Sequence, residues 1–342
     1  MKIAVAGHSL IHPRQQRFFL QVAELGHQVL LVMPSQWGTL RATSSDGPGD
    51  LLSRALPVLA GEGDMYQYRL VGLEGTLQEF QPDILYVQQE MTCHFTGSCI
   101  QLARDHGWTL AAFVWENLRP LTDEGKERLK SVDLLVCGND EAVRLHPEAR
   151  FWTVLPQVGV DMDHFQARPD VSRETSVAFA GRAVAEKGID LLGQAWPTAR
   201  LLAWTDFRWL PWLYSQAKVI VCHSLDTPQW KEQAMPYVAV EALANGCAVV
   251  ASDAGAIPFW LGGGFSGRPC PGAIITPQGD VAGLRQGIDA ALGNWEEMGQ
   301  AGRVWVKQYL GSKAVAQLLV ERLSLAVQEH RNTLAAGRSV DV

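Results

Sequence analysis

The sequence lacks the features that mark secreted and membrane-spanning proteins. Its six cysteines include no Cys-x-x-Cys pair, and Cys222 and Cys247 lie in apolar, strand-like runs. Buried free thiols in a reducing compartment fit this pattern best. No apolar run is long enough to cross a bilayer, and the apolar run within residues 1–10 is too short for a signal peptide. We therefore expect a cytoplasmic protein without a transmembrane segment.

The sequence also lacks an excess of positive charge, a metal-binding motif and a dinucleotide-binding fingerprint. The formal net charge is −7, whereas general nucleic-acid binding needs Lys and Arg to neutralise phosphates. His94 lies beside Cys93, with Cys99 further on, but no fourth ligand follows at a recognisable spacing, so we expect no metal site. The loop at residues 7–13 lacks Gly-x-Gly-x-x-Gly, which leaves a nicotinamide-dependent dehydrogenase without support.

What the sequence does contain is an alternation of short apolar runs and helical patterns. At 342 residues the chain exceeds the usual size of one hydrophobic core, so two domains are expected. Residues 2–6 predict a strand, residues 14–25 a helix and residues 28–32 a second strand, which begins a βαβ unit. Further apolar runs lie at residues 84–87, 110–114, 134–137 and 152–155, with helix-like segments such as 96–106 between them. This order predicts an α/β fold with parallel strands.

The second half repeats the pattern in a shorter form. Strands are predicted at 177–180, 200–204 and 219–223, with only a short helical piece around 209–216 between the last two. The polar stretch 161–175 has the composition of an interdomain linker, and residues 313–330 carry a helical apolar stripe. Four tryptophans are expected mainly in the core, and the alternatives are stacking on a sugar and a peripheral contact with a membrane surface. They are Trp196, Trp204, Trp209 and Trp212.

Two cations follow the strand at 177–180. Gly181 permits a sharp exit from the strand, Arg182 comes next, and Lys187 lies five residues further on. A planar guanidinium and a point charge at the carboxyl end of a strand suit a diphosphate better than a single carboxylate. The alternative is a surface Arg182 and a Lys187 that pairs with Glu186.

A second segment, residues 230–258, reads as loop, helix, strand and loop. Pro236 suits a first helical position, and Asn245-Gly246 ends the helix before an apolar strand. The free N–H groups at the helix start would attract an anion. Glu241, one turn further in, could accept two hydrogen bonds from a ribose diol.

Together these two segments resemble the donor-binding half of the retaining glycosyltransferases of family 4, which have the GT-B fold of two facing Rossmann-like domains. The resemblance implies that Arg182 and Lys187 grip the donor diphosphate and that Glu241 holds the nucleotide ribose. It also implies a further set of donor-binding residues, namely Gly181, Gln233, Pro236, Tyr237 and Val238.

This sequence departs from the family pattern in several places. The family has two glutamates separated by seven residues, and that spacing back from Glu241 points to Gln233, with Glu232 one residue upstream. A one-residue bulge in a loop would let Glu232 take the catalytic position, and we favour Glu232. Pro236 stands where the family usually has Gly, and Phe259 where an acidic residue is common. The second domain also lacks a strand and helix, which leaves the donor base unassigned.

Candidates for the acceptor side lie in the first half, after predicted strands. Ligands of open α/β sheets bind at the carboxyl ends of the strands, and the matching loop of the family lines the interdomain cleft. These candidates are Gly7, His8, Ser9, Glu90 and Glu116. A solvated histidine and helix-capping carboxylates are the alternative interpretations.

The resemblance implies three parts: an acceptor-side domain at residues 1–160, a donor domain at 161–312, and a terminal helix at 313–342 that crosses back to the first domain. It implies a hexosyltransferase that uses a nucleotide diphosphate sugar, without a cofactor, in glycan or glycolipid biosynthesis. The acceptor could be a glycan, a glycolipid or a small molecule. A non-catalytic donor-binding subunit and a GT-B-shaped nucleotide-sugar epimerase are the alternatives.

Overall fold

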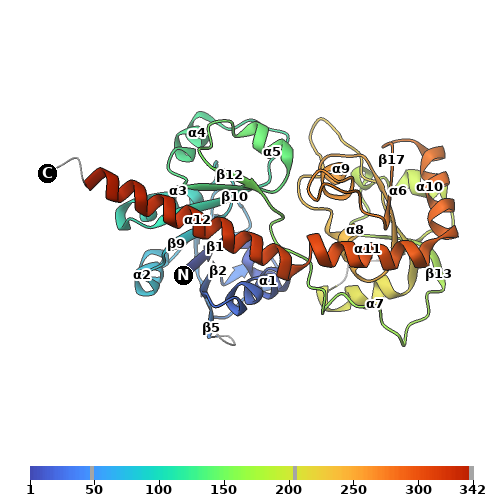
Figure 1. Cartoon of the computed structure of the whole chain (residues 1–342), viewed down its shortest axis with the longest axis horizontal. Coiled ribbons are helices and arrows are strands. Elements are labelled where there is room, and N and C mark those ends of the chain that lie inside the picture. The colour runs from blue at the N-terminus through green and yellow to red at the C-terminus, as the bar shows by residue number, and fades with distance from the viewer. Residues whose placement is uncertain (47–49, 203–205, 339–342) are drawn as a thin grey trace. The chain divides into compact units, whose positions relative to one another are not determined.

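The computed structural model describes residues 1–46, 50–202 and 206–338, and it divides the chain into two compact units (Figure 1). Unit 1 consists of Met1–Val158 and Val315–Val342, and unit 2 consists of Gly159–Ala314. The expected boundaries lay at 160/161 and 312/313. Both units are built on sheets of parallel strands with helices between them, so the predicted α/β class is confirmed.

Unit 1 is organised around an eight-stranded sheet in the order β12-β11-β10-β9-β1-β2-β6-β5. Every strand pair in it is parallel except β5 with β6. Its strands are β1 (Lys2–Ala6), β2 (Gln28–Pro34), β5 (Ser45–Asp46), β6 (Leu51–Leu56), β9 (Ile84–Gln88), β10 (Thr109–Val114), β11 (Leu134–Cys137) and β12 (Trp152–Val154). Two small antiparallel pairs accompany it: β3 (Gln36–Trp37) with β4 (Leu40–Arg41), and β7 (Val58–Ala60) with β8 (Arg69–Leu70). The central strands are buried throughout, which explains their unbroken apolar runs.

The helices of unit 1 cover this sheet and begin slightly earlier than the sequence predicts. Helix α1 starts at Pro13, where proline fits the first turn, and α3 starts at His94 after the N-cap Cys93. The helical elements are η1 (His8–Ile11), α1 (Pro13–Glu24), α2 (Leu73–Phe80), α3 (His94–His106), α4 (Asp123–Leu129), α5 (Asp140–Leu145) and α12 (Ser312–Arg338).

Helix α12, drawn in red in Figure 1, follows unit 2 in sequence, but from Val315 onward it packs on unit 1. Leu319 and Leu323 are buried on it. His330 Nδ1 lies 2.9 Å from Asp133 Oδ1, and Arg331 donates to Asp83 Oδ1 at 2.6 Å. Apolar burial and polar contacts therefore both tie this helix to the first half of the chain.

Unit 2 has a five-stranded, fully parallel sheet in the order β14-β13-β15-β16-β17. Its strands are β13 (Thr175–Ala180), β14 (Arg200–Leu202), β15 (Ala217–Cys222), β16 (Ala248–Ser252) and β17 (Ala273–Thr276). Its helical elements are η2 (Ala185–Lys187), α6 (Ile189–Ala195), η3 (Phe207–Trp209), α7 (Leu210–Ser215), α8 (Tyr237–Ala244), α9 (Ile257–Leu261), α10 (Val281–Gly293) and α11 (Trp295–Tyr309). Strand β15 ends one residue before the predicted end, so that His223 lies in the following loop. The predicted strand at 200–204 runs beyond the described residues after Leu202.

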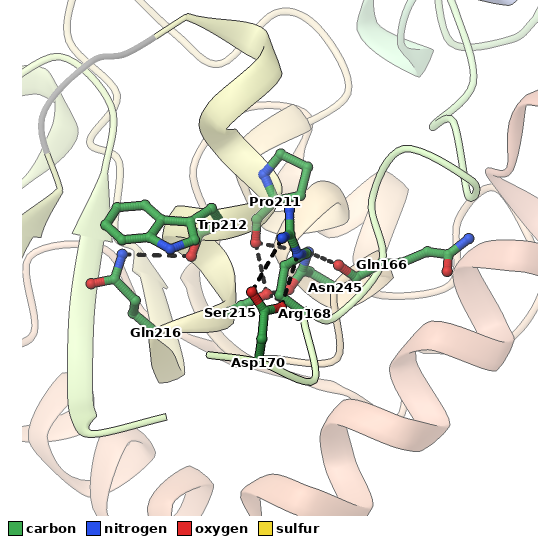
Figure 2. A network of polar contacts seen from close by, with 8 residues as sticks. All are labelled: Gln166, Arg168, Asp170, Pro211, Trp212, Ser215, Gln216 and Asn245. Atoms are coloured by element: carbon green, nitrogen blue, oxygen red, sulfur yellow. Dashed lines mark hydrogen bonds and ion pairs between the residues drawn. The ribbon is translucent and has the colours of Figure 1, made fainter. Parts of the chain in front are cut away.

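The predicted linker at 161–175 is packed against unit 2, so its composition was misleading. Figure 2 shows how the buried amide of Asn245, at the end of α8, fastens it. Asn245 Nδ2 donates to the carbonyls of Gln166 and Pro211 at 3.1 and 3.2 Å, and its Oδ1 lies 3.0 Å from Ser215 Oγ. The Arg168 N–H donates to the same Ser215 oxygen at 2.9 Å. Buried hydrogen bonds thus hold this polar stretch, together with Phe165, which is 1% exposed and packs against Phe207 and Tyr214.

The expectation for the tryptophans is wrong in part. Trp209 and Trp212 are 57% and 42% exposed. Trp196 packs against the core of unit 2, where the Arg285 guanidinium lies 4.7 Å from its ring centroid. Trp204 lies outside the described residues.

Candidate functional site

The candidate site of unit 2 lies at the carboxyl edge of its parallel sheet, where β13, β15, β16 and β17 all end. Because parallel strands end at one edge of a sheet, the loops that follow them gather there. The turn at residues 181–188 follows β13, the loop at 223–236 follows β15, and the loop at 253–256 follows β16. The side chains that the sequence analysis selected come from the first two of these loops and from α8.

The turn that carries Lys187 is fixed by its backbone. Gly188 has φ of +65°, and a Cβ atom there would lie 2.0 Å from the carbonyl oxygen of His223, so only glycine allows this close approach. The Leu225 N–H donates to the carbonyl of Glu186 at 2.8 Å. Both contacts dock the turn onto the loop after β15. Arg182, at the start of the turn, is exposed.

The alternative interpretation, in which Lys187 pairs with Glu186, is wrong. The Lys187 ammonium donates to Glu232 Oε1, and the two side chains are 22% and 13% exposed. Ser224 Oγ donates to the same carboxylate oxygen at 2.7 Å. The Trp230 ring centroid lies 4.7 Å from the ammonium, within range of a cation–π contact. A cation and a carboxylate are therefore held together in a partly enclosed site.

The backbone explains how Glu232, rather than Gln233, comes to lie beside Lys187. The carbonyl of Glu232 accepts a hydrogen bond from the Ala256 N–H at 2.9 Å. Gly255 has φ of +47°, and a Cβ atom on it would lie 2.4 Å from that carbonyl oxygen. The loop after β16 thus holds the Glu232 backbone in place. The assignment of Glu232 to the catalytic position stays a prediction, which this geometry favours.

Helix α8 differs from expectation at its start. Pro236 is the N-cap, with φ −71° and ψ 78°, so the first helical residues are Tyr237 and Val238. The Val240 N–H makes the first intrahelical bond, to the Pro236 carbonyl. Glu241 is 1% exposed, and its Oε2 accepts from the Tyr214 hydroxyl at 3.3 Å.

Ser224, Trp230 and Tyr214 were missed by the sequence analysis. Ser224 is the second residue after β15 (Ala217–Cys222), and its place in the loop at the end of the strand could have identified it. Its carbonyl accepts from Ser252 Oγ at 2.6 Å, which braces the loop against β16. Neighbouring His223 is 1% exposed, and burial lowers its pKa, so the ring is neutral at pH 7.

The candidates of unit 1 lie at the carboxyl edge of the larger sheet. Gly7 packs against β9, because a Cβ on it would lie 2.9 Å from the carbonyl oxygen of Gln88. His8 is not a solvated histidine: its Nδ1 lies 2.8 Å from Gln89 Oε1, and its ring centroid is 4.7 Å from that of Trp37. Burial lowers the pKa of His8. Ser9 Oγ donates to Gln88 Oε1 at 3.4 Å.

Glu90 and Glu116 do not cap the helices that follow them, because the N-caps of α3 and α4 are Cys93 and Thr122. They brace the loop after β10 instead. Glu90 Oε1 accepts from the backbone N–H groups of residues 115 and 116 at 2.6 and 3.0 Å, and Glu116 Oε1 accepts from those of residues 118 and 119 at 2.9 and 3.2 Å. Glu90 is only 5% exposed, and burial raises its pKa to about 7.

All six cysteines are free and buried. Burial raises the pKa of Cys222 to about 12, so this thiol beside the site is neutral. Across residues 1–46, 50–202 and 206–338, no three His, Cys, Asp or Glu side chains gather in a way that could hold a metal ion. Within the same ranges, no helix has the length and apolar character needed to cross a membrane.

Comparison with known proteins bears on both units. Residues 199–294 match the sequence model of a family described as Glycosyl transferases group 1. Sucrose-phosphate synthase from Thermosynechococcus elongatus superposes with a TM-score of 0.70 at 16% identity, over 98% of this chain and 100% of that one. Anabaena Alr3699/HepE in complex with UDP-glucose gives 0.67 at 14% identity, over 95% and 99%. AviGT4, a glycosyltransferase involved in avilamycin A biosynthesis, gives 0.65 at 16%, over 96% and 98%.

The chain has the GT-B fold. The resemblance drawn from the two motifs is therefore confirmed for the fold, and the matched segment includes Glu232 and Glu241. The turn with Arg182 and Lys187 lies just ahead of that segment. A search of curated protein sequences found no match.

Proposed function

We propose that this GT-B protein is a retaining glycosyltransferase of the hexosyltransferase type, which moves a sugar from a nucleotide diphosphate sugar to an acceptor hydroxyl in glycan or glycolipid biosynthesis. One observation carries the proposal: Lys187, five residues after Arg182, and Glu232, from the loop after β15, are held together at the carboxyl edge of the sheet. The family match over residues 199–294 and the UDP-glucose bound to the structurally similar Anabaena protein support it.

The proposed chemistry depends on stabilising the leaving group. As the glycosidic bond breaks, negative charge grows on the departing diphosphate. Lys187, Arg182 and the N–H groups at the start of α8 would stabilise that charge, and preorganised donors of this kind supply a large share of many rate enhancements. No metal ion is invoked in this step.

The two glutamates would bind the rest of the donor. Glu232 would orient the donor sugar, since a carboxylate accepts hydrogen bonds from sugar hydroxyls. Glu241 would hold the ribose, with the Tyr214 hydroxyl fixing the carboxylate. Gln233, Pro236, Tyr237 and Val238 would form the remaining donor contacts.

We propose that the acceptor binds at the carboxyl edge of the sheet in unit 1, around Gly7, His8 and Ser9, with Glu90 and Glu116 bracing the adjoining loop. The neutral His8 ring can exchange hydrogen bonds with an acceptor hydroxyl. The leaving phosphate would itself take the acceptor proton. Cytoplasm remains the proposed location, in keeping with six buried free thiols.

Donor hydrolysis tests the function directly. The purified protein is incubated with UDP-, GDP-, ADP- and TDP-sugars, and nucleotide release is followed by mass spectrometry. We expect release from one donor, and a loss of roughly 100-fold in Lys187→Ala, the scale seen when one transition-state donor is removed. Lys307→Ala is the matched control, because Lys307 is an exposed lysine on α11.

The same assay separates the alternatives. An epimerase would change the donor sugar without releasing nucleotide. A non-catalytic subunit would bind a nucleotide sugar and release nothing, even with acceptors added. Turnover that is equal in Lys187→Ala and Lys307→Ala would remove Lys187 from the mechanism.

A further inference from the structure

The ammonium of Lys187 serves two anions if the proposed function holds, and this inference rests on that function. One anion is the donor diphosphate. The other is Glu232, whose carboxylate already accepts from Lys187 in the folded chain. Lys187 contributes one positive charge and Glu232 one negative charge, so their local charges cancel.

Glu232 is held in place at two points, its carboxylate and its backbone carbonyl. Ser224, which is fully buried, donates to Glu232 Oε1 at 2.7 Å. The backbone of Glu232 is held by the Ala256 N–H at 2.9 Å. Both side chains of the ion pair are less than a quarter exposed, so solvent screens their interaction only partly.

We propose that Glu232 is a specificity-determining residue that discriminates between the sugar-bearing donor and the bare nucleoside diphosphate. A donor brings sugar hydroxyls that donate to Glu232 and draw its charge away from Lys187. A nucleoside diphosphate brings no such hydroxyls, so its phosphates compete with the carboxylate for Lys187. The site therefore weakens the binding of its own product and favours product release.

Glu232→Gln tests this because the amide keeps the shape and removes the charge. Binding of UDP, GDP, ADP and TDP, and of their glucose conjugates, is measured by isothermal titration calorimetry on the full chain. We expect the variant to bind its nucleoside diphosphate about five- to tenfold more tightly, since it frees a partly buried cation. Affinity for the glucose conjugate should not rise by more than about twofold, because the amide loses acceptor strength toward the sugar.

Two further variants separate charge from structure. In a Lys187→Ala background, Glu232→Gln should change nucleoside diphosphate affinity by less than about twofold, because the competition runs through Lys187. Ser224→Ala keeps the carboxylate charge and loses its hydrogen bond, so it should not tighten nucleoside diphosphate binding. Thermal melting of each variant checks that it is folded.

The outcomes distinguish the inference from the function beneath it. If the parent protein binds none of the nucleoside diphosphates or their conjugates, the proposed function fails and the inference falls with it. If the parent binds one and Glu232→Gln is equal or weaker, the inference alone is wrong. A gain that persists without Lys187, or that Ser224→Ala reproduces, overturns it as well.

Discussion

Replacing Glu90 by glutamine should stabilise the protein above neutral pH and change its stability little at pH 5. Glu90 is 5% exposed, and burial raises its pKa from 4.5 to about 7, although two backbone N–H groups donate to it. The folded state therefore holds this proton more tightly than the unfolded chain does. The resulting stabilisation is complete below pH 4.5 and is lost as the pH rises through 7.

The pKa difference sets the size of the effect. A rise from 4.5 to about 7 corresponds to about 3 kcal/mol that the ionised, buried carboxylate costs above pH 7. Glutamine removes this charge and can still accept from the same N–H groups. Because an amide oxygen does not fit the site perfectly, we expect about 2 kcal/mol of net stabilisation at pH 8.5.

Thermal unfolding at pH 5.0 and 8.5 is the assay. For a unit of this size, about 2 kcal/mol corresponds to a rise in Tm of roughly 4–8 °C at pH 8.5, with little change at pH 5.0. Glu79→Gln, at an exposed position on α2, should shift neither melting temperature. If the change in Tm caused by Glu90→Gln is no more favourable at pH 8.5 than at pH 5.0, ionisation of the carboxylate does not destabilise the fold and the reasoning is refuted.

Two further predictions concern the packing of unit 2. Gly188→Ala should lower both stability and donor hydrolysis, because its Cβ would lie 2.0 Å from the His223 carbonyl oxygen. Gly193→Ala in α6 is the control and should leave both intact, because no atom lies within 4 Å of a Cβ added there. Equal behaviour of the two variants would contradict the argument. Asn245→Ala should lower the free energy of unfolding by about 2–3 kcal/mol, since it removes the three hydrogen bonds of a buried amide. Gln216→Ala is the control, because the Gln216 amide makes a 3.5 Å contact to the Trp212 carbonyl (Figure 2) and accepts from Arg200 at 3.1 Å, both at the surface. It should cost less than about 0.5 kcal/mol in a denaturant titration, and a similar loss in both variants would assign no special role to Asn245.

The central strands of both sheets could be predicted because each is buried on both faces. Strand β1 has the predicted bounds, and the run predicted at 84–87 is β9 (Ile84–Gln88). Strand β6 was missed, because its residues are only half buried and its polar Ser53 and Arg54 interrupt the apolar pattern. A strand at the outer part of a sheet carries less hydrophobic signal than one at its centre.

The sequence analysis selected the charged residues of the candidate site but not the residues that position them. Lys187 and Glu232 were selected from a motif, but their contact depends on Gly188, Gly255 and Ser224. Ser224 acts through one hydroxyl, and only its position just after a strand could have identified it. Gly188 and Gly255 act through backbone geometry, which leaves no pattern in a single sequence. The linker expectation failed for the same reason, because Asn245 holds that stretch through hydrogen bonds from a distant part of the chain.

The place of α12 bears on how the chain folds during synthesis. Unit 1 is made of two separated stretches, Met1–Val158 and Val315–Val342, whereas unit 2 is one continuous stretch between them. Domains usually fold in the order in which they are made. Here the first unit to begin emerging from the ribosome is the last to be completed, because Leu319 and Leu323 of α12 complete its packing only after all of unit 2 has been made.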